Sequence, residues 1–203
     1  MHLILMPLAA VRIIGLRGFA HATTQEIAET AGVSEGLIYR YYKTKLDLGL
    51  ELFKKHYGEV LSLMREESAR HKEPLERLRH AAKAYYTWFD ANTDVARFVI
   101  KTHSEFLDLV DEDQGLINLT SDALKDMFGE GLFSLVPGDI LAAMFFGTFF
   151  QVSVEALHGQ VKGPLAPRME PIIDALVALI AQAGPRSLGP GSAPHPTESG
   201  DEK

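Results

Sequence analysis

The stretch Thr23 to Lys45, TTQEIAETAGVSEGLIYRYYKTK, carries the strongest structural signal in this chain. Thr23 and Glu26 have the spacing of a capping box, in which the hydroxyl accepts from the Glu26 N–H and the carboxylate reaches back to the Thr23 N–H. Gly32 follows at a point where a helix must reverse through a positive φ, which penalises a Cβ. The stretch therefore predicts a helix, a tight glycine turn and a second short helix.

Apolar residues within this stretch follow the period of amphipathic helices. Ser34 can cap the second helix, in which Ile38 and Tyr42 lie four residues apart and face inward. The small Ala28, the turn glycine Gly32 and the apolar Ile38 have the spacing of a helix-turn-helix unit. Because such a unit places its second helix in the major groove, the spacing predicts DNA binding.

The charge distribution agrees with a DNA-binding amino-terminal part. The chain has a net charge of −7, which is unusual for a nucleic-acid binder. Between Arg12 and Lys55, however, seven cations oppose five anions, so this segment carries +2 and the remainder −9. A basic head on an acidic body is expected of a protein that touches phosphate with one end only.

Composition limits the remaining possibilities. The chain has 203 residues, of which 46% are hydrophobic, a length that suits one domain or a small domain joined to a larger one. It has no cysteine, which excludes a disulfide framework and a thiolate metal site. No apolar run reaches the length of a membrane span, and Met1 to Met6 lacks the basic flank and cleavage site of a secretory signal. We therefore expect a cytoplasmic protein.

Helical periodicity continues along the chain, and no strand pattern or internal repeat interrupts it. The fold class predicted is all-α: a three-helix helix-turn-helix domain in residues 1–46 and a helical effector-binding and dimerisation domain in 47–184, about nine helices in total. A Pro-, Gly- and Ser-rich tail, 185–203, is expected to be disordered. Outside the opening stretch, the expected helices are 8–17, 45–70, 75–91, 94–110, 116–128, 137–158 and 169–183.

Three segments resemble the TetR (tetracycline-repressor-like) family of regulators. They are RGF at Arg17 to Phe19, TTQEIAETAGVSEG at Thr23 to Gly36, and IYRYYKTK at Ile38 to Lys45. The resemblance implies that the first three helices bind DNA, that the remaining helices bind a small ligand, and that the last two form a four-helix bundle with a second subunit. It thus implies a homodimeric regulator of transcription, expected to be a repressor that an effector releases from a palindromic operator.

The chain departs from the family pattern at three places. It begins with MHLILMP rather than a longer basic segment, so Pro7 is expected to begin a short first helix. Either the arm that would enter the minor groove is absent, or the start of the reading frame is misplaced. Glu35 stands where a basic residue is frequent, and Leu37 stands where a small hydroxyl residue is frequent. These departures concern which DNA sequence is read rather than the fold.

Helical geometry predicts which side chains meet DNA. If Ile38 faces inward, Leu37 and Arg40 face outward, where Arg40 can read guanine and Leu37 a thymine methyl group. Lys45 can pair with a phosphate near the start of the following helix, and threonines, tyrosines and Lys43 can set the register on the backbone. The predicted DNA-binding residues are Thr23, Thr24, Ser34, Gly36, Leu37, Tyr39, Arg40, Tyr41, Lys43 and Lys45.

Aromatic residues gather in the helices of the predicted body. They can line a cavity for a hydrophobic or acyl effector, and His103 offers such a ligand a polar anchor. The same residues can equally form an ordinary core, so both interpretations stay open. The predicted pocket residues are Tyr85, Trp88, Phe89, Phe98, His103, Phe106, Phe145 and Phe149.

Other chemistries receive little support. Asp108, Asp111, Glu112 and Asp113 lack the glycine offset and the closing glutamate of a calcium loop. The histidines show no metal-ligand spacing, and we find no nucleophile elbow, P-loop or dinucleotide fingerprint. The sequence thus predicts no enzyme, metal or cofactor. The alternative to a regulator is a helical small-molecule-binding protein whose DNA-binding head is degenerate.

Overall fold

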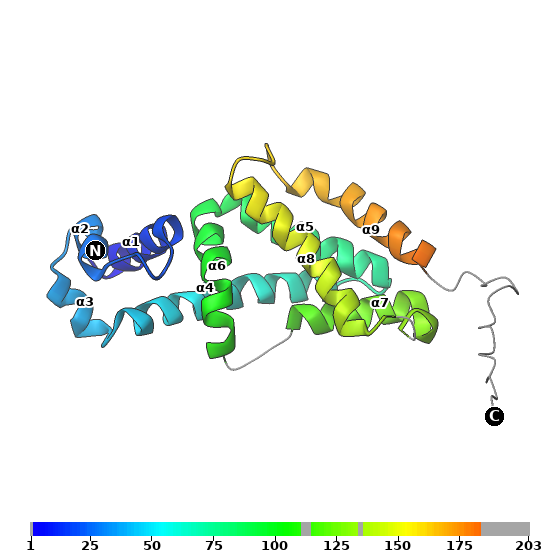
Figure 1. The fold of residues 1–203 in the computed structure, drawn as a ribbon, viewed down its shortest axis with the longest axis horizontal. Coiled ribbons are helices and arrows are strands. Elements are labelled where there is room, and N and C mark those ends of the chain that lie inside the picture. The colour runs from blue at the N-terminus through cyan, green and yellow to red at the C-terminus, as the bar shows by residue number, and fades with distance from the viewer. Residues whose placement is uncertain (1, 111–114, 134–135, 184–203) are drawn as a thin grey trace, which may run out of the picture.

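The computed structural model describes residues 2–110, 115–133 and 136–183, and within these ranges every regular element is helical (Figure 1). The predicted tail, 185–203, lies outside the described residues, as do Asp111, Glu112 and Asp113. The α-helices are α1 (His2–Arg17), α2 (Thr24–Ala31), α3 (Glu35–Tyr41), α4 (Lys45–Ala69), α5 (Pro74–Ala91), α6 (Thr93–Phe106), α7 (Gly115–Phe133), α8 (Gly138–Leu157) and α9 (Met169–Ala183). Two short 3₁₀ helices, η1 (Leu107–Leu109) and η2 (Ala166–Arg168), complete the set.

The helices form an elongated molecule with a small head at one end (Figure 1). α1, α2 and α3 make the head, and α4 runs from the head into the body. α6 crosses α4 and contacts α1, while α5, α7, α8 and α9 build the rest of the body. This arrangement gives the all-helical architecture that the sequence predicts.

Two hydrophobic cores hold the helices together. The first joins the head to α4 and α6 through fully buried side chains such as Ile14, Ile38, Phe53 and Phe98. The second joins α5, α7, α8 and α9, with Tyr86 buried at its centre. Because the first core extends on both sides of residue 46, the head packs as part of a larger unit. The domain boundary at this residue stays a prediction.

Local signals in the opening stretch have the predicted geometry at α2. Glu26 N donates to Thr23 Oγ1 over 3.1 Å, and Thr23 N donates to the Glu26 carboxylate over 3.2 Å, which confirms the capping box. Gly32 ends α2 in the left-handed region, with φ 66°. A second capping box, between Thr44 and Asp47, starts α4.

The predicted cap at Ser34 is wrong. Ser34 stands at the N-cap position of α3 in an extended conformation, but its side chain makes no cap hydrogen bond. In a side-chain cap, the Ser34 hydroxyl would accept a hydrogen bond from the Leu37 N–H. This N–H instead donates to the Ser34 carbonyl over 3.0 Å. A main-chain bond therefore closes the first turn of α3.

The first helix is longer than predicted. α1 begins at His2, so Pro7 lies inside the helix rather than at its first position. Proline cannot donate to the carbonyl four residues earlier, which weakens that turn. Met6, Ala9 and Ala10 are nevertheless buried in the first core. Their burial compensates for the missing bond and keeps the helix continuous.

Gly49 of α4 lies where the head meets the body. The Phe19 and Phe106 rings pack edge to face, with centroids 4.8 Å apart. A Cβ on Gly49 would lie 2.8 Å from the Phe19 ring and 3.0 Å from the Phe106 ring. Glycine is therefore required here for both rings to pack against α4.

We expect Gly49→Ala to destabilise the protein by about 1–3 kcal/mol, because the added methyl group overpacks the buried Phe106 ring and the partly buried Phe19 ring. The matched control is Gly58→Ala on the same helix, where a Cβ meets nothing within 4 Å. That substitution is expected to stabilise by about 0.5–1 kcal/mol through helix propensity. Thermal unfolding of both variants measures the difference, and equal melting temperatures would contradict the packing argument.

Candidate nucleic-acid interface and ligand cavities

The outward face of α3 is formed by Gly36, Tyr39 and Arg40, all of which are exposed. Ile38 on the opposite face is completely buried and fixes the helix to the head. Tyr39 retains 50% and Tyr41 48% of their accessible surface, a large exposure for aromatic side chains. Leu37 is half-buried, whereas Ser34 and Lys43 are exposed. The second helix of the motif therefore presents a polar and aromatic surface to solvent.

A three-residue hydrogen-bond cluster connects α2 with this face. Thr24 is buried, and its hydroxyl donates to Glu35 over 2.5 Å. The same hydroxyl lies 3.1 Å from the Tyr39 hydroxyl. Thr24 therefore serves the α2–α3 contact, which does not support the predicted phosphate contact. Glu35 orients Tyr39 through Thr24 while standing at the start of α3.

Lys45 also has a structural role within the head. Its ammonium donates to the Phe19 carbonyl and the Ala22 carbonyl, each over 2.8 Å. It also lies 4.5 Å from the centroid of the Phe19 ring. Two of its three donors are thus engaged by the loop between α1 and α2. The predicted phosphate contact must compete with these bonds.

Thr23 is exposed, yet its hydroxyl takes part in the capping box of α2. The Glu26 carboxylate of that box also pairs with Arg17 over 2.9 Å. Arg40 and Lys43 are exposed cations on or next to α3. The predicted DNA contacts, taken as a set, stay a prediction.

Three of the predicted pocket residues line an interior cavity of about 30 Å³: Tyr85, Phe145 and Phe149. This volume suits about one water molecule rather than an effector. Phe98 and Phe106 instead belong to the first core and Phe89 to the second, so these three residues fill space. Trp88 is partly buried against both cores.

Sequence reasoning missed other residues around this cavity. Ala81 and Ala82 are the informative ones, because two small side chains on α5 leave the space open. The pair is visible in the sequence, although its effect depends on what lies opposite. The full set of missed lining residues is Met64, Leu78, Ala81, Ala82 and Thr120.

Polar groups beside the cavity are satisfied internally. The Tyr85 hydroxyl donates to Ser153 over 2.9 Å, and Ser153 donates to the Phe149 carbonyl over 3.0 Å. The Tyr86 hydroxyl donates to the same carbonyl over 3.2 Å. Burial raises the pKa of Tyr85 to about 12, so this phenol is neutral at physiological pH. The cavity wall is therefore apolar in character.

His103 of α6 lies among aromatic rings of two other helices, α4 and α8. Its ring centroid is 5.8 Å from that of Tyr57 on α4, and 5.3 Å from that of Phe150 on α8. Burial lowers the pKa of His103, because desolvation penalises the imidazolium. The neutral ring thus packs at the point where α4, α6 and α8 approach one another.

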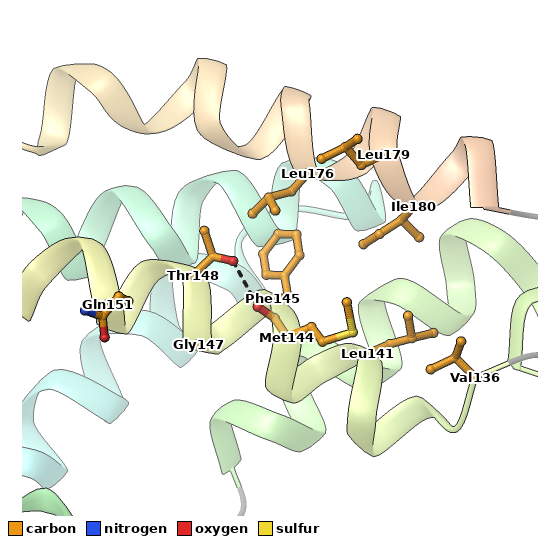
Figure 2. Close-up of a pocket in the computed structure, with 10 residues that line it drawn as sticks. All are labelled: Val136, Leu141, Met144, Phe145, Gly147, Thr148, Gln151, Leu176, Leu179 and Ile180. Carbon is orange, nitrogen blue, oxygen red and sulfur yellow. Dashed lines mark hydrogen bonds between the residues drawn. The ribbon is translucent and has the colours of Figure 1, made fainter.

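A groove of about 720 Å³ lies between α8 and α9 (Figure 2). Met144 and Phe145 of α8 face Leu176, Leu179 and Ile180 of α9 across it. Met144 retains 61% and Leu179 65% of their accessible surface. Contrary to the sequence expectation, α8 is long and apolar enough to cross a membrane by length and composition, although buried core helices meet the same criteria. We name the surface that α8 and α9 present around this groove the α8–α9 face.

Within the described residues, no group of three or more His, Asp or Glu side chains is placed to hold a metal ion. The structural features of interest are therefore the exposed face of α3, the interior cavity and the α8–α9 face. Together they describe a helix-turn-helix head on a helical body with apolar cavities.

Comparison with known proteins identifies this class. Residues 8–52 match the family described as bacterial regulatory proteins, tetR family. The fatty acid metabolism regulator protein of Bacillus subtilis is 40% identical over 70 residues, which cover 33% of this chain and 36% of that protein. The transcriptional activator FasR of Mycolicibacterium smegmatis is 26% identical over 134 residues, covering 65% and 57%. The chain thus spans less than two thirds of these curated relatives.

Solved structures extend the likeness of the fold over most of the chain. The fatty acid degradation regulator FadR from Bacillus halodurans superimposes with a TM-score of 0.70 at 22% identity, covering 86% of this chain and 97% of that one. FadR from Bacillus subtilis, solved in complex with stearoyl-CoA, gives 0.62 at 23% identity over 87% and 98%. The family match thus covers the amino-terminal helices, and the solved structures show the same fold over most of the chain.

The contrast between Lys43 and Lys45 yields a prediction. Lys43→Met is expected to leave the stability of the protein unchanged. Because an exposed cation is removed, it is expected to weaken binding to all DNA sequences alike, and to lower by about one the slope of log affinity against log salt concentration. Lys45→Met is expected to destabilise the head by roughly 1–3 kcal/mol, because two charge-assisted bonds are lost. Thermal unfolding and DNA titrations at several salt concentrations separate the two effects. Equal melting temperatures for the two variants would contradict the role of Lys45 in the head.

Proposed function

We propose that this protein is a homodimeric transcriptional repressor that binds a palindromic DNA operator and releases it when a fatty acyl thioester binds to the body. The observation that carries the DNA-binding part is the exposed face of α3, where Arg40 and Tyr39 project from a helix that Ile38 fixes to the head. A helix presented in this way fits the major groove, and an arginine on it can bind guanine through two hydrogen bonds.

A second subunit is required for a palindromic operator, and the α8–α9 face is the proposed contact. Ile140, Met144 and Leu179 are large apolar residues that stay exposed on a single chain. An apolar patch of this kind favours association with another protein surface. Pairing α8 and α9 with the same helices of a second copy forms a four-helix bundle that buries these side chains.

Two observations support a fatty acyl effector. The interior cavity has an apolar wall, so it suits a hydrocarbon chain rather than a charged ligand. In addition, relatives are named as regulators of fatty acid metabolism and degradation, and one related structure contains stearoyl-CoA. Because the cavity measures about 30 Å³ here, an acyl chain requires the helices around it to move apart.

Such a movement reaches the DNA-binding head through α4 and α6. Both helices belong to the core that includes α1–α3, and His103 of α6 packs against Tyr57 of α4. The ligand-bound body then favours a spacing of the two heads that does not fit successive major grooves. The ligand acts because it binds this second state more tightly than the DNA-binding state.

The DNA-binding proposal is tested with Arg40→Ala in the full-length chain. We expect sequence-specific binding to a fragment containing the protein's own promoter to fall at least ten-fold, because a bidentate contact to guanine is worth about 1–3 kcal/mol. Mobility-shift titrations with specific and random DNA measure this loss, and Lys83→Met, an exposed cation on α5, is the control. Wild-type binding that is absent, or insensitive to salt, would instead favour the alternative of a degenerate head.

The dimer contact is tested with Met144→Glu. A carboxylate on the α8–α9 face is expected to shift the protein from dimer to monomer at micromolar concentration, because its burial is unfavourable. Leu109→Glu changes another exposed apolar residue, outside α8 and α9, and is expected to leave the dimer intact. Sedimentation velocity measures both variants, and a dimeric Met144→Glu protein would place the contact elsewhere.

A further inference from the structure

A second groove, distinct from the α8–α9 face, lies where the head meets the body. It measures about 320 Å³, near the lower end of the range for ligand sites. Leu16 of α1 lies at one edge, Ile100 of α6 contributes to the lining, and Phe150, Val154 and Leu157 of α8 form an apolar wall. The groove is also lined by Arg97, Lys101 and His158. Two cations and an imidazole therefore border an apolar surface. We call this the junction groove.

The cations of the junction groove are unexpected in an acidic body. Arg97 and Lys101 lie four residues apart on one face of α6, where two like charges disfavour the helix slightly. Arg97 is paired with exposed Asp94 over a long 3.8 Å, so its charge is only weakly neutralised. The pair therefore has a positive potential that an anion in the groove would neutralise.

Lys101 connects the junction groove to the DNA-binding head. Its ammonium donates to the Leu16 carbonyl over 2.9 Å, near the carboxyl end of α1. Close by, Gly15 allows the two helices to approach, because a Cβ there would lie 3.2 Å from the Phe98 nitrogen of α6. An anion that attracts Lys101 competes directly with this bond between α1 and α6.

The junction groove is also a neighbour of the interior cavity. Phe150 lines the groove and Phe146 lines the cavity, and their ring centroids are 5.8 Å apart. His103 lies against both rings, 5.3 Å from the Phe150 centroid and 6.4 Å from that of Phe146. A small number of side chains therefore separates a cationic groove from an apolar cavity.

From this arrangement we infer that the junction groove binds the phosphate-bearing end of the acyl thioester, while the acyl chain passes Phe150 and Phe146 into the interior cavity. The inference rests on the proposed function for the class of effector. Charge complementarity selects the occupant, since Arg97 and Lys101 match phosphate oxygens. The flexible arm that joins the phosphates to the acyl chain then follows the wall formed by α8 toward the interior cavity. The site places the ligand against the bond that ties α1 to α6.

The test compares ligands with and without phosphates. Stearoyl-CoA and stearic acid are titrated calorimetrically, at low and high salt, into the wild type, Arg97→Gln and the double variant Arg97→Gln/Lys101→Met. Lys83→Met removes one exposed cation from α5 and serves as the control. Arg97→Gln alone leaves the Lys101–Leu16 bond in place, and circular dichroism verifies that each variant is folded.

We expect the double variant to bind stearoyl-CoA at least ten-fold more weakly, with a smaller salt dependence, while stearic acid binds it as it binds the wild type. Lys83→Met should behave as the wild type with both ligands. Equal stearoyl-CoA affinity in all variants would overturn the junction groove yet leave the effector class standing. A parallel loss of stearic acid would also overturn it, because the residues would then act on the fold. A wild type that binds no stearoyl-CoA would overturn the effector class together with the groove.

Discussion

The packing of Phe19 against Phe106 across Gly49 is the contact on which the arrangement of head and body depends. It brings together the loop after α1, the connecting helix α4 and the body helix α6 at one point. Lys45 reinforces the same place by binding two carbonyls of the loop between α1 and α2. Because closely packed rings have few alternative arrangements, α4 and α6 cannot move far without moving the head. A change in the body therefore has a direct mechanical path to α3.

Burial is distributed unevenly along α8, and this distribution gives the helix several roles at once. Phe145 and Phe149 belong to the second core, whereas Met144 is exposed and Phe150 lines the junction groove. A helix that is apolar all round is expected to be surrounded by protein. In a single chain this condition is only partly met, which is why the proposed dimer accounts for its composition better than the monomer does.

The head and the body differ in how their polar groups are used. In the head, hydroxyl, carboxylate and ammonium groups such as those of Thr24, Glu35 and Lys45 bind one another or the main chain and so hold α3 in place. In the body, Tyr85 and Ser153 satisfy each other beside an apolar cavity. A ligand-controlled DNA-binding protein requires both properties: polar contacts that hold α3 in place in the head, and a cavity with an apolar wall in the body.

Local signals in the sequence were sufficient for the helices and the motif, because capping boxes, glycine turns and helical periodicity act over three or four residues. The Thr23–Glu26 box, the positive φ of Gly32 and the burial of Ile38 all follow from neighbours in the chain. Side-chain partners from distant segments were beyond such reasoning. Which helices pack together decides that Thr24 binds Glu35 and that Phe98 fills a core. It also decides that Arg97 and Lys101 line one groove with Leu16 and α8. Tertiary packing therefore decided which predicted residues are free to bind a ligand, because a side chain satisfied within the fold is no longer available to one.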